Sequence, residues 1–173
     1  MAVRHGQKGA ALIVSLVILL VITMLGLTAI QNSSMQERMA TAMVDRSIAF
    51  EAAEASLRDA QAWLDAQTTR PTGGTSGNPD VWAGEGALVT EVGADAEDWS
   101  AAQWAAHSRV YSQTVAGATE APRYVIEEWQ FLPDSLETGT TSGIWYYRVT
   151  ARGLGGSANA EVLLQASLRK RFN

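Results

Sequence analysis

The sequence predicts an α+β fold, in which one long N-terminal helix, apolar in its first half, packs on a small antiparallel β-sheet. Three hydroxyl residues are the only polar interruptions of the apolar stretch over residues 10–30. Apolar residues then recur at three- and four-residue spacing as far as residue 64, which is one face of a helix. Near the C-terminus, residues 144–152 and 158–170 alternate apolar and polar side chains, as half-buried strands do.

The apolar stretch is the first element. As a helix, residues 10–30 span roughly 30 Å, the thickness of the hydrocarbon core of a bilayer. The hydrophobic part of an ordinary signal peptide has only about 7–15 residues, so this stretch is too long for one. Arg4, His5 and Lys8 precede it and predict a cytoplasmic N-terminus by the positive-inside rule. On composition alone, a plain single-pass anchor explains these features equally well.

The helix is predicted to continue beyond the apolar stretch. No Pro or Gly occurs over residues 27–70, which predicts one helix from residue 10 to about residue 67, roughly 85 Å long. Residues 10–36 form its apolar half and residues 37–67 its amphipathic half. The residues of the second half expected to pack on the sheet are Phe50, Ala53, Leu57 and Leu64.

A loop and a short helix are expected next. Residues 68–80 are rich in Gly, Pro, Thr and Asn, which predicts a loop that ends the long helix. Asp95 and Asp98 predict the capped start of a short helix over residues 96–107. The residues that this helix is expected to bury are Trp99, Ala102 and Ala106.

The sheet is predicted from three segments, residues 123–132, 144–152 and 158–170, with the "GLGGS" segment as the hairpin loop between the last two. These segments form a small antiparallel meander. The residues expected to face the long helix are Trp145, Tyr147, Val149, Ala151, Ala160, Val162, Leu164, Ala166 and Leu168.

The composition argues against several classes of function. The chain has 173 residues, a net charge of −5 and no cysteine. The acidic balance argues against nonspecific nucleic-acid binding, and disulfides and thiolate metal sites are excluded. His107 has serines near it in sequence, which does not make a catalytic triad, so no catalytic residue and no cofactor are expected. Asp95, Glu97 and Asp98 offer oxygen ligands for calcium but lack the spacing of a calcium loop.

Aromatic and basic residues supply candidates for contact with other proteins. Trp82, Trp99 and Tyr146 are possible interface anchors. The residues expected in the core instead are Trp99, Trp129 and Trp145. The C-terminal segment "LRKRF", residues 168–172, is expected to be a solvated strand end or a contact for an acidic partner.

Four features near the N-terminus carry a family resemblance, namely the basic leader ending at Gly9, the opening "AALIVSL", the segment "QERMA" and the segment "AFEAAEASLRDAQ". In these features the chain resembles the PilX-type minor pilins of the type IV pilus. The C-terminal segment "YYRVTARGLGGSANAEVLLQASLRKRF" resembles the closing hairpin of the same family. Together they cover about half of the chain, and residues 68–143 show no resemblance.

The resemblance implies a processed, membrane-borne subunit. Residues 1–9 would be a leader that a prepilin peptidase removes after Gly9, followed by N-methylation of Ala10. Residues 10–36 would lie in the inner membrane and later in the fibre core, residues 37–67 would carry the amphipathic half of the helix, and residues 68–173 would form a periplasmic domain.

One position departs from the pattern of most pilins. These carry Glu at the fifth mature position, and Val14 stands there in this chain. That carboxylate is thought to meet the N-terminal amine of a neighbouring subunit, so its absence fits a place at or near the fibre tip. The alternative is that Val14 simply faces lipid.

The resemblance also implies partners, namely other minor pilins, the major pilin, a tip adhesin, the inner-membrane assembly platform and the prepilin peptidase. Two other functions remain open from the sequence. One is a K-type minor pseudopilin of type II secretion, which also lacks the fifth-position Glu. The other is a single-pass, membrane-anchored periplasmic binding or sensor protein.

Overall fold

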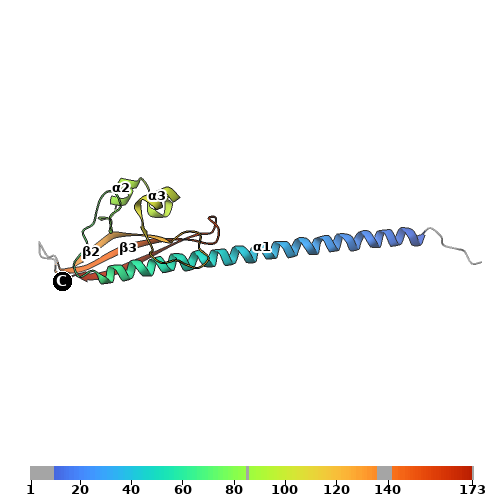
Figure 1. Ribbon diagram of the computed structural model, residues 1–173, viewed down its shortest axis with the longest axis horizontal. Coiled ribbons are helices and arrows are strands. Elements are labelled where there is room, and N and C mark those ends of the chain that lie inside the picture. The colour runs from blue at the N-terminus through green and yellow to red at the C-terminus, as the bar shows by residue number, and fades with distance from the viewer. Residues whose placement is uncertain (1–9, 85, 136–141, 173) are drawn as a thin grey trace, which may run out of the picture. The chain divides into compact units, whose positions relative to one another are not determined.

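A computed structural model describes residues 10–84, 86–135 and 142–172 (Figure 1). In chain order the elements are α1 (Ala10–Ala66), α2 (Ala87–Val92), the 3₁₀ helix η1 (Ala96–Asp98), α3 (Ala101–His107), β1 (Arg109–Val110), β2 (Arg123–Pro133), β3 (Gly143–Leu154) and β4 (Glu161–Phe172). The chain divides into two compact units, one ending at Met43 and the other beginning at Val44. Helix α1 contributes to both units.

The described part of the first unit is α1 as far as Met43. The three hydroxyl side chains of its apolar stretch, residues 10–30, form hydrogen bonds inside the helix: the Ser15 hydroxyl donates to the carbonyl of Leu12 at 2.9 Å, and the Thr28 hydroxyl to that of Met24 at 2.9 Å. Thr23 bonds in the same way to the turn before it. Because each of these three hydroxyls has a partner in its own helix, residues 10–30 suit an apolar environment.

The sheet of the second unit is antiparallel, with strand order β1-β2-β3-β4. The predicted strands over residues 123–132 and 144–152 are confirmed as β2 and β3. The predicted segment 158–170 corresponds to β4, which begins three residues later and ends two residues later, at Glu161–Phe172, and the hairpin loop lies between Leu154 and Glu161. The predicted α+β architecture, with the long helix packed on this sheet, is confirmed.

One face of the sheet packs on α1. The core of this face contains Tyr124, Ile126, Tyr147, Val149 and Ala151 from the strands, with Ala60, Leu64 and Val81. Small residues on α1 allow a close approach: a Cβ at Gly153 would lie 2.2 Å from the carbonyl oxygen of Ala49 and 2.4 Å from the amide nitrogen of Ala53. The helix therefore contacts β3 almost backbone to backbone, through its buried stripe Ala49, Ala52, Ala53, Ser56, Ala60 and Leu64.

The expected packing of Phe50 is wrong. Its side chain is 47% exposed, whereas Ala53 and Leu64 are buried and Leu57 packs at the edge of the core. The close approach of Gly153 leaves room only for small side chains at this level of α1. Phe50 is one helical step, about 100°, from Ala49 and is turned away from the strand.

The other face of the sheet is covered as well. Figure 1 shows α2 and α3 on the side of the sheet opposite the second-unit part of α1. Their core contains Trp82, Leu88, Ala96, Trp99, Trp104 and Val125. Residues 143–154 are consequently buried from both sides: Thr150 and Arg152, expected to point outward, are only 2% and 7% exposed. The short helix predicted over residues 96–107 belongs to this second layer, but its place against the sheet was not predicted.

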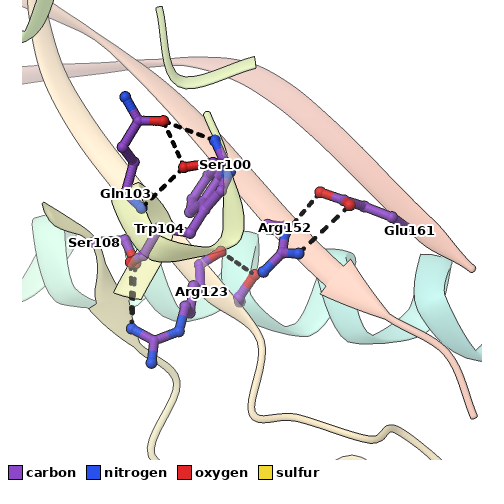
Figure 2. Close-up of polar contacts among 8 residues, drawn as sticks. Ser100, Gln103, Trp104, Ser108, Arg123, Arg152 and Glu161 are labelled. Carbon is purple, nitrogen blue, oxygen red and sulfur yellow. Dashed lines mark hydrogen bonds and ion pairs between the residues drawn. The ribbon is translucent and has the colours of Figure 1, made fainter. Parts of the chain in front are cut away.

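The short helix begins later than predicted. Asp95 makes no side-chain cap, and the 3₁₀ helix that follows it ends at Asp98. Ser100 caps α3 instead: its hydroxyl accepts from the Gln103 amide, and the Gln103 side chain accepts from the Ser100 amide at 2.8 Å (Figure 2). The later start changes the buried face, so Trp104 is buried and the predicted Ala102 and Ala106 are exposed.

Two tryptophans also differ from expectation. Trp129, expected in the core, is 44% exposed, because it is the extra residue of a β-bulge between Glu128 and Gln130 that turns it outward. Trp82, a candidate interface anchor, is only 1% exposed, and its backbone forms isolated parallel β-bridges with Gly74 and Glu127. Trp99 is buried and Trp145 packs against the core, as predicted for both.

Candidate functional site

The first candidate site is the apolar half of α1. Ala10 is the first residue of the helix, and Val14 on its first turns is 56% exposed, like the apolar residues around it. Gly9, the expected end of the leader, lies outside the described residues. Among the described residues, α1 is the one helix long and apolar enough to cross a membrane. This half of the helix is compatible with a membrane anchor.

The second candidate site is a clasp between α1 and the β3–β4 loop, formed by Asp45, Gly155 and Ser157. The Asp45 carboxylate accepts hydrogen bonds from the Ser157 amide, at 3.1 Å, and from the Ser157 hydroxyl. A Cβ at Gly155 would lie 2.4 Å from the Asp45 carbonyl oxygen, so only glycine fits there. The loop is held from its other side by Thr119, whose amide and hydroxyl both donate to the Gly155 carbonyl.

The clasp has an electrostatic signature. The hydrogen bond from the Ser157 hydroxyl is the main cause that lowers the pKa of Asp45 below its ordinary value of 3.8. The charged form of the carboxylate is therefore the form that the loop binds. Asp45 is the second residue of the second unit, so the clasp fixes the β3–β4 loop where that unit begins on α1.

At the other end of the second unit, Lys170 of the basic C-terminal segment binds the end of α1. The Lys170 ammonium donates to the carbonyls of Leu64, at 2.7 Å, and Asp65, at 2.6 Å, in the last turn of α1. A cation there satisfies carbonyls that have no partner within the helix. Arg171 pairs with Asp134 at 2.7 Å. The described residues supply no ion-pair partner for the exposed Arg169.

Two buried carboxylates are fully engaged by arginines. Glu127 accepts from Arg148 at 3.0 and 3.1 Å, and Glu128 accepts from Arg70, whose guanidinium also lies 3.6 Å above the Trp145 ring. A shallow cleft of about 370 Å³ lies beside the second pair, lined by Arg70, Pro71, Thr72, Gly73, Ala83 and Glu128. The two charged side chains that line this cleft, Arg70 and Glu128, form an ion pair with each other at 2.8 Å.

The remaining predicted site residues lie apart from one another or inside the fold. In the described ranges, no three His, Cys, Asp or Glu side chains converge as metal ligands, and Asp95, Glu97 and Asp98 are no exception. His107 is half-buried, with its Nδ1 2.8 Å from the Gly77 carbonyl and its ring against Trp82 and Trp99. Tyr146 is half-buried in β3.

Sequence reasoning missed the structural roles of Asp45 and Lys170. Asp45 reads as one of many charges flanking the helical stripe, and Lys170 as one of several basic residues at a strand end. The two glycines before Ser157 were a usable signal, because adjacent glycines after a strand indicate close approach to another backbone.

Comparison with known proteins gives two matches along the chain. Residues 8–58 match the family model described as PilX N-terminal, and residues 52–170 match the one described as type IV pilus assembly protein PilX C-term. No curated protein and no solved structure matches the chain. The two family matches together span both the apolar helix and the domain that follows it.

Proposed function

Since the chain belongs to the PilX family of type IV pilus assembly proteins, we propose that it is a minor pilin, a non-enzymatic structural subunit that helps to start pilus assembly and sits at or near the fibre tip. The observation that carries this proposal is the combination of an apolar half-helix with a family match to both parts of the chain.

The proposed life of the subunit has two stages. The prepilin peptidase cuts after Gly9 and Ala10 is N-methylated, while the apolar half of α1 holds the subunit in the inner membrane with its domain in the periplasm. The same half-helix later packs in the fibre core. Its internally bonded hydroxyls support both stages, because neither lipid nor a neighbouring helix has to supply a polar partner.

The tip position rests on Val14. A single charged residue inside a membrane helix costs roughly 2.5–3.5 kcal/mol on insertion scales, so a carboxylate there is retained only where it has a partner. A subunit without it cannot neutralise the amine of a neighbour in the fibre. It is therefore suited to a place where the shaft begins, in contact with other minor pilins, the major pilin, a tip adhesin and the assembly platform.

A type II secretion pseudopilin of the K type is the alternative. That class usually carries a large inserted helical domain. Here α2 has six residues and α3 has seven, which favours the pilus subunit.

Processing and assembly can be tested together. Gly9→Val should leave an unprocessed precursor in the membrane, because a branched side chain blocks the approach of the peptidase to the backbone. N-terminal sequencing of the mature wild-type chain should begin at Ala10, and deleting the gene should lower the number of surface fibres. A different N-terminus, or unchanged fibre number in the deletion strain, would overturn the proposal.

A further inference from the structure

Strand β4 forms one of the two edges of the sheet and is the longer of them. In the described part of the chain it pairs with β3 on one side only, and its register with β3 is unbroken over 12 residues. The opposite edge, β1, has only two residues. An edge strand presents a row of backbone N–H and C=O groups that can pair with another chain, and β4 presents the longer row.

The usual protections of an edge are missing from the centre of β4. Natural sheets guard edges with proline, with bulges or with charged residues. Residues 162–168 of β4 contain no proline and no charge, and their pairing with β3 contains no bulge. The charges are confined to the strand ends, Glu161 at one and Arg169, Lys170 and Arg171 at the other. This edge is open to pairing.

The two faces of β4 differ in chemistry. On the face that packs on α1, Leu164, Ala166 and Leu168 stand opposite Ala151, Val149 and Tyr147. The three β3 residues are fully buried, but their β4 partners are only half-buried. The apolar core on this face is thus incomplete at its rim, where one more strand would cover it.

On the opposite face, β4 carries Leu163, which packs against the core under α2 and α3, and then polar and basic residues. Gln165 and Ser167 are exposed, and Arg169 and Arg171 follow at the same two-residue spacing. The Arg171 side chain is 50% exposed and forms an ion pair with Asp134. Arg169 is exposed and has no ion-pair partner within the described ranges. A carboxylate placed beside it on a neighbouring strand would lie within reach.

We propose that the free edge of β4 binds an extended segment of another protein, which adds to the sheet as a fifth strand. In the bound segment, apolar residues alternate with acidic ones. The apolar residues would lie over the α1 face of the sheet, and an acidic residue would lie beside Arg169. A second copy of this chain fits less well, because its β4 contributes only one carboxylate, Glu161, which Arg152 already holds at 2.6 Å (Figure 2). The proposed binding at this edge does not depend on a position of the subunit at a pilus tip.

The test uses the full chain in detergent micelles and synthetic peptides of about ten residues, the length of a long strand. One peptide alternates valine and glutamate, a second alternates valine and lysine, and a third is the glutamate peptide with every backbone amide methylated, so that neither of its edges can pair. Hydrogen–deuterium exchange is followed by mass spectrometry. The glutamate peptide should slow exchange in β4 by about tenfold or more, and the other two peptides should leave it unchanged.

A charge reversal sharpens the test. Arg169→Glu should lose the response to the glutamate peptide and gain one to the lysine peptide, while Arg169→Gln should respond weakly to both. Arg58→Glu is the matched control, since Arg58 is an exposed α1 residue and the charge change is the same.

Several outcomes would overturn the proposal. The proposal fails if none of the peptides slows exchange in β4. It also fails if the glutamate and lysine peptides slow exchange equally. Protection of β4 without peptide that increases with protein concentration would show that a second copy occupies the edge instead.

Discussion

A single carboxylate, Asp45, joins α1 to a loop more than a hundred residues away in sequence. It receives two hydrogen bonds from Ser157, and Gly155 lies against its backbone. An exposed aspartate on a helix normally contributes little to stability. Here its contribution comes from the loop that it orders, and it depends on the charge of the carboxylate.

Asp45→Asn should weaken the dependence of folding stability on pH in the acidic range. The folded state lowers the pKa of Asp45, so the stability gained from its charged form is fully present above the ordinary value of 3.8 and is lost as the pH falls through the folded-state value. Melting temperatures of wild type and variant should therefore differ at pH 7 and converge below about pH 3.8. The same substitution at the exposed Asp98 is the control. A difference that persists at low pH would show that the charge is not the cause.

Tyr147→Phe should be nearly neutral for stability at pH 7. The Tyr147 hydroxyl is buried and forms no hydrogen bond of good geometry with the described residues; Arg70 lies near it but already pairs with Glu128. Its removal therefore leaves no group unsatisfied, and a change within about 0.5 kcal/mol is expected. Burial raises the pKa of Tyr147 to about 12. Its neutral form therefore stabilises the fold below about pH 10, and this contribution is lost between pH 10 and 12.

The measurement for Tyr147 is a pair of denaturant titrations at pH 7 and pH 11. The variant should lose less stability between them than the wild type does. A loss of more than about 1 kcal/mol at pH 7 would reveal a hydrogen bond to the hydroxyl.

Among the elements, the contact of α1 with β3 depends on residues that have little or no side chain. Gly153→Ala should destabilise the second unit by about 1–3 kcal/mol, because the added methyl group meets backbone atoms of Ala49 and Ala53, which cannot move aside. Chemical denaturation of the purified protein measures the loss. Gly26→Ala, where nothing lies within 4 Å, is the control and should cost nothing.

The orientation of α1 can be checked with two truncations. Leu64→Ala should lower the free energy of unfolding by about 2–5 kcal/mol, because Leu64 is 1% exposed in the core. Phe50→Ala should cost less than about 1 kcal/mol, since half of the side chain is exposed. The reverse order of these two effects would mean that the helix packs on the sheet with its other side.

How far the sequence predicts the elements depends on how local the determining interactions are. Helical spacing along α1 and alternation along β3 depend on nearby residues, so both elements could be predicted. The start of α3 was misplaced because Asp95 and Ser100 are both good capping residues, and only tertiary packing selects Ser100. Trp129 was misplaced because a bulge depends on pairing with β3, a distant segment. Phe50 was misplaced because the close approach of Gly153, a distant residue, selects Ala49, Ala52 and Ala53 as the face of α1 that meets β3.

For the whole molecule, copy number in the fibre follows from Val14. If the subunit starts the shaft, quantitative mass spectrometry of sheared fibres should find few copies relative to the main subunit. Val14→Glu should still insert into the membrane, since a penalty of about 2.5–3.5 kcal/mol is small beside the apolar helix around it. It should also raise the copy number, because the new carboxylate can neutralise a neighbour's amine. A near-stoichiometric wild-type subunit would refute the tip assignment.

Ser15, Thr23 and Thr28 keep their hydrogen bonds inside α1. These three side chains therefore keep their partners whether lipid or protein surrounds residues 10–30. In a subunit that passes between bilayer and fibre, as proposed above, none of the three would need a new partner in either direction.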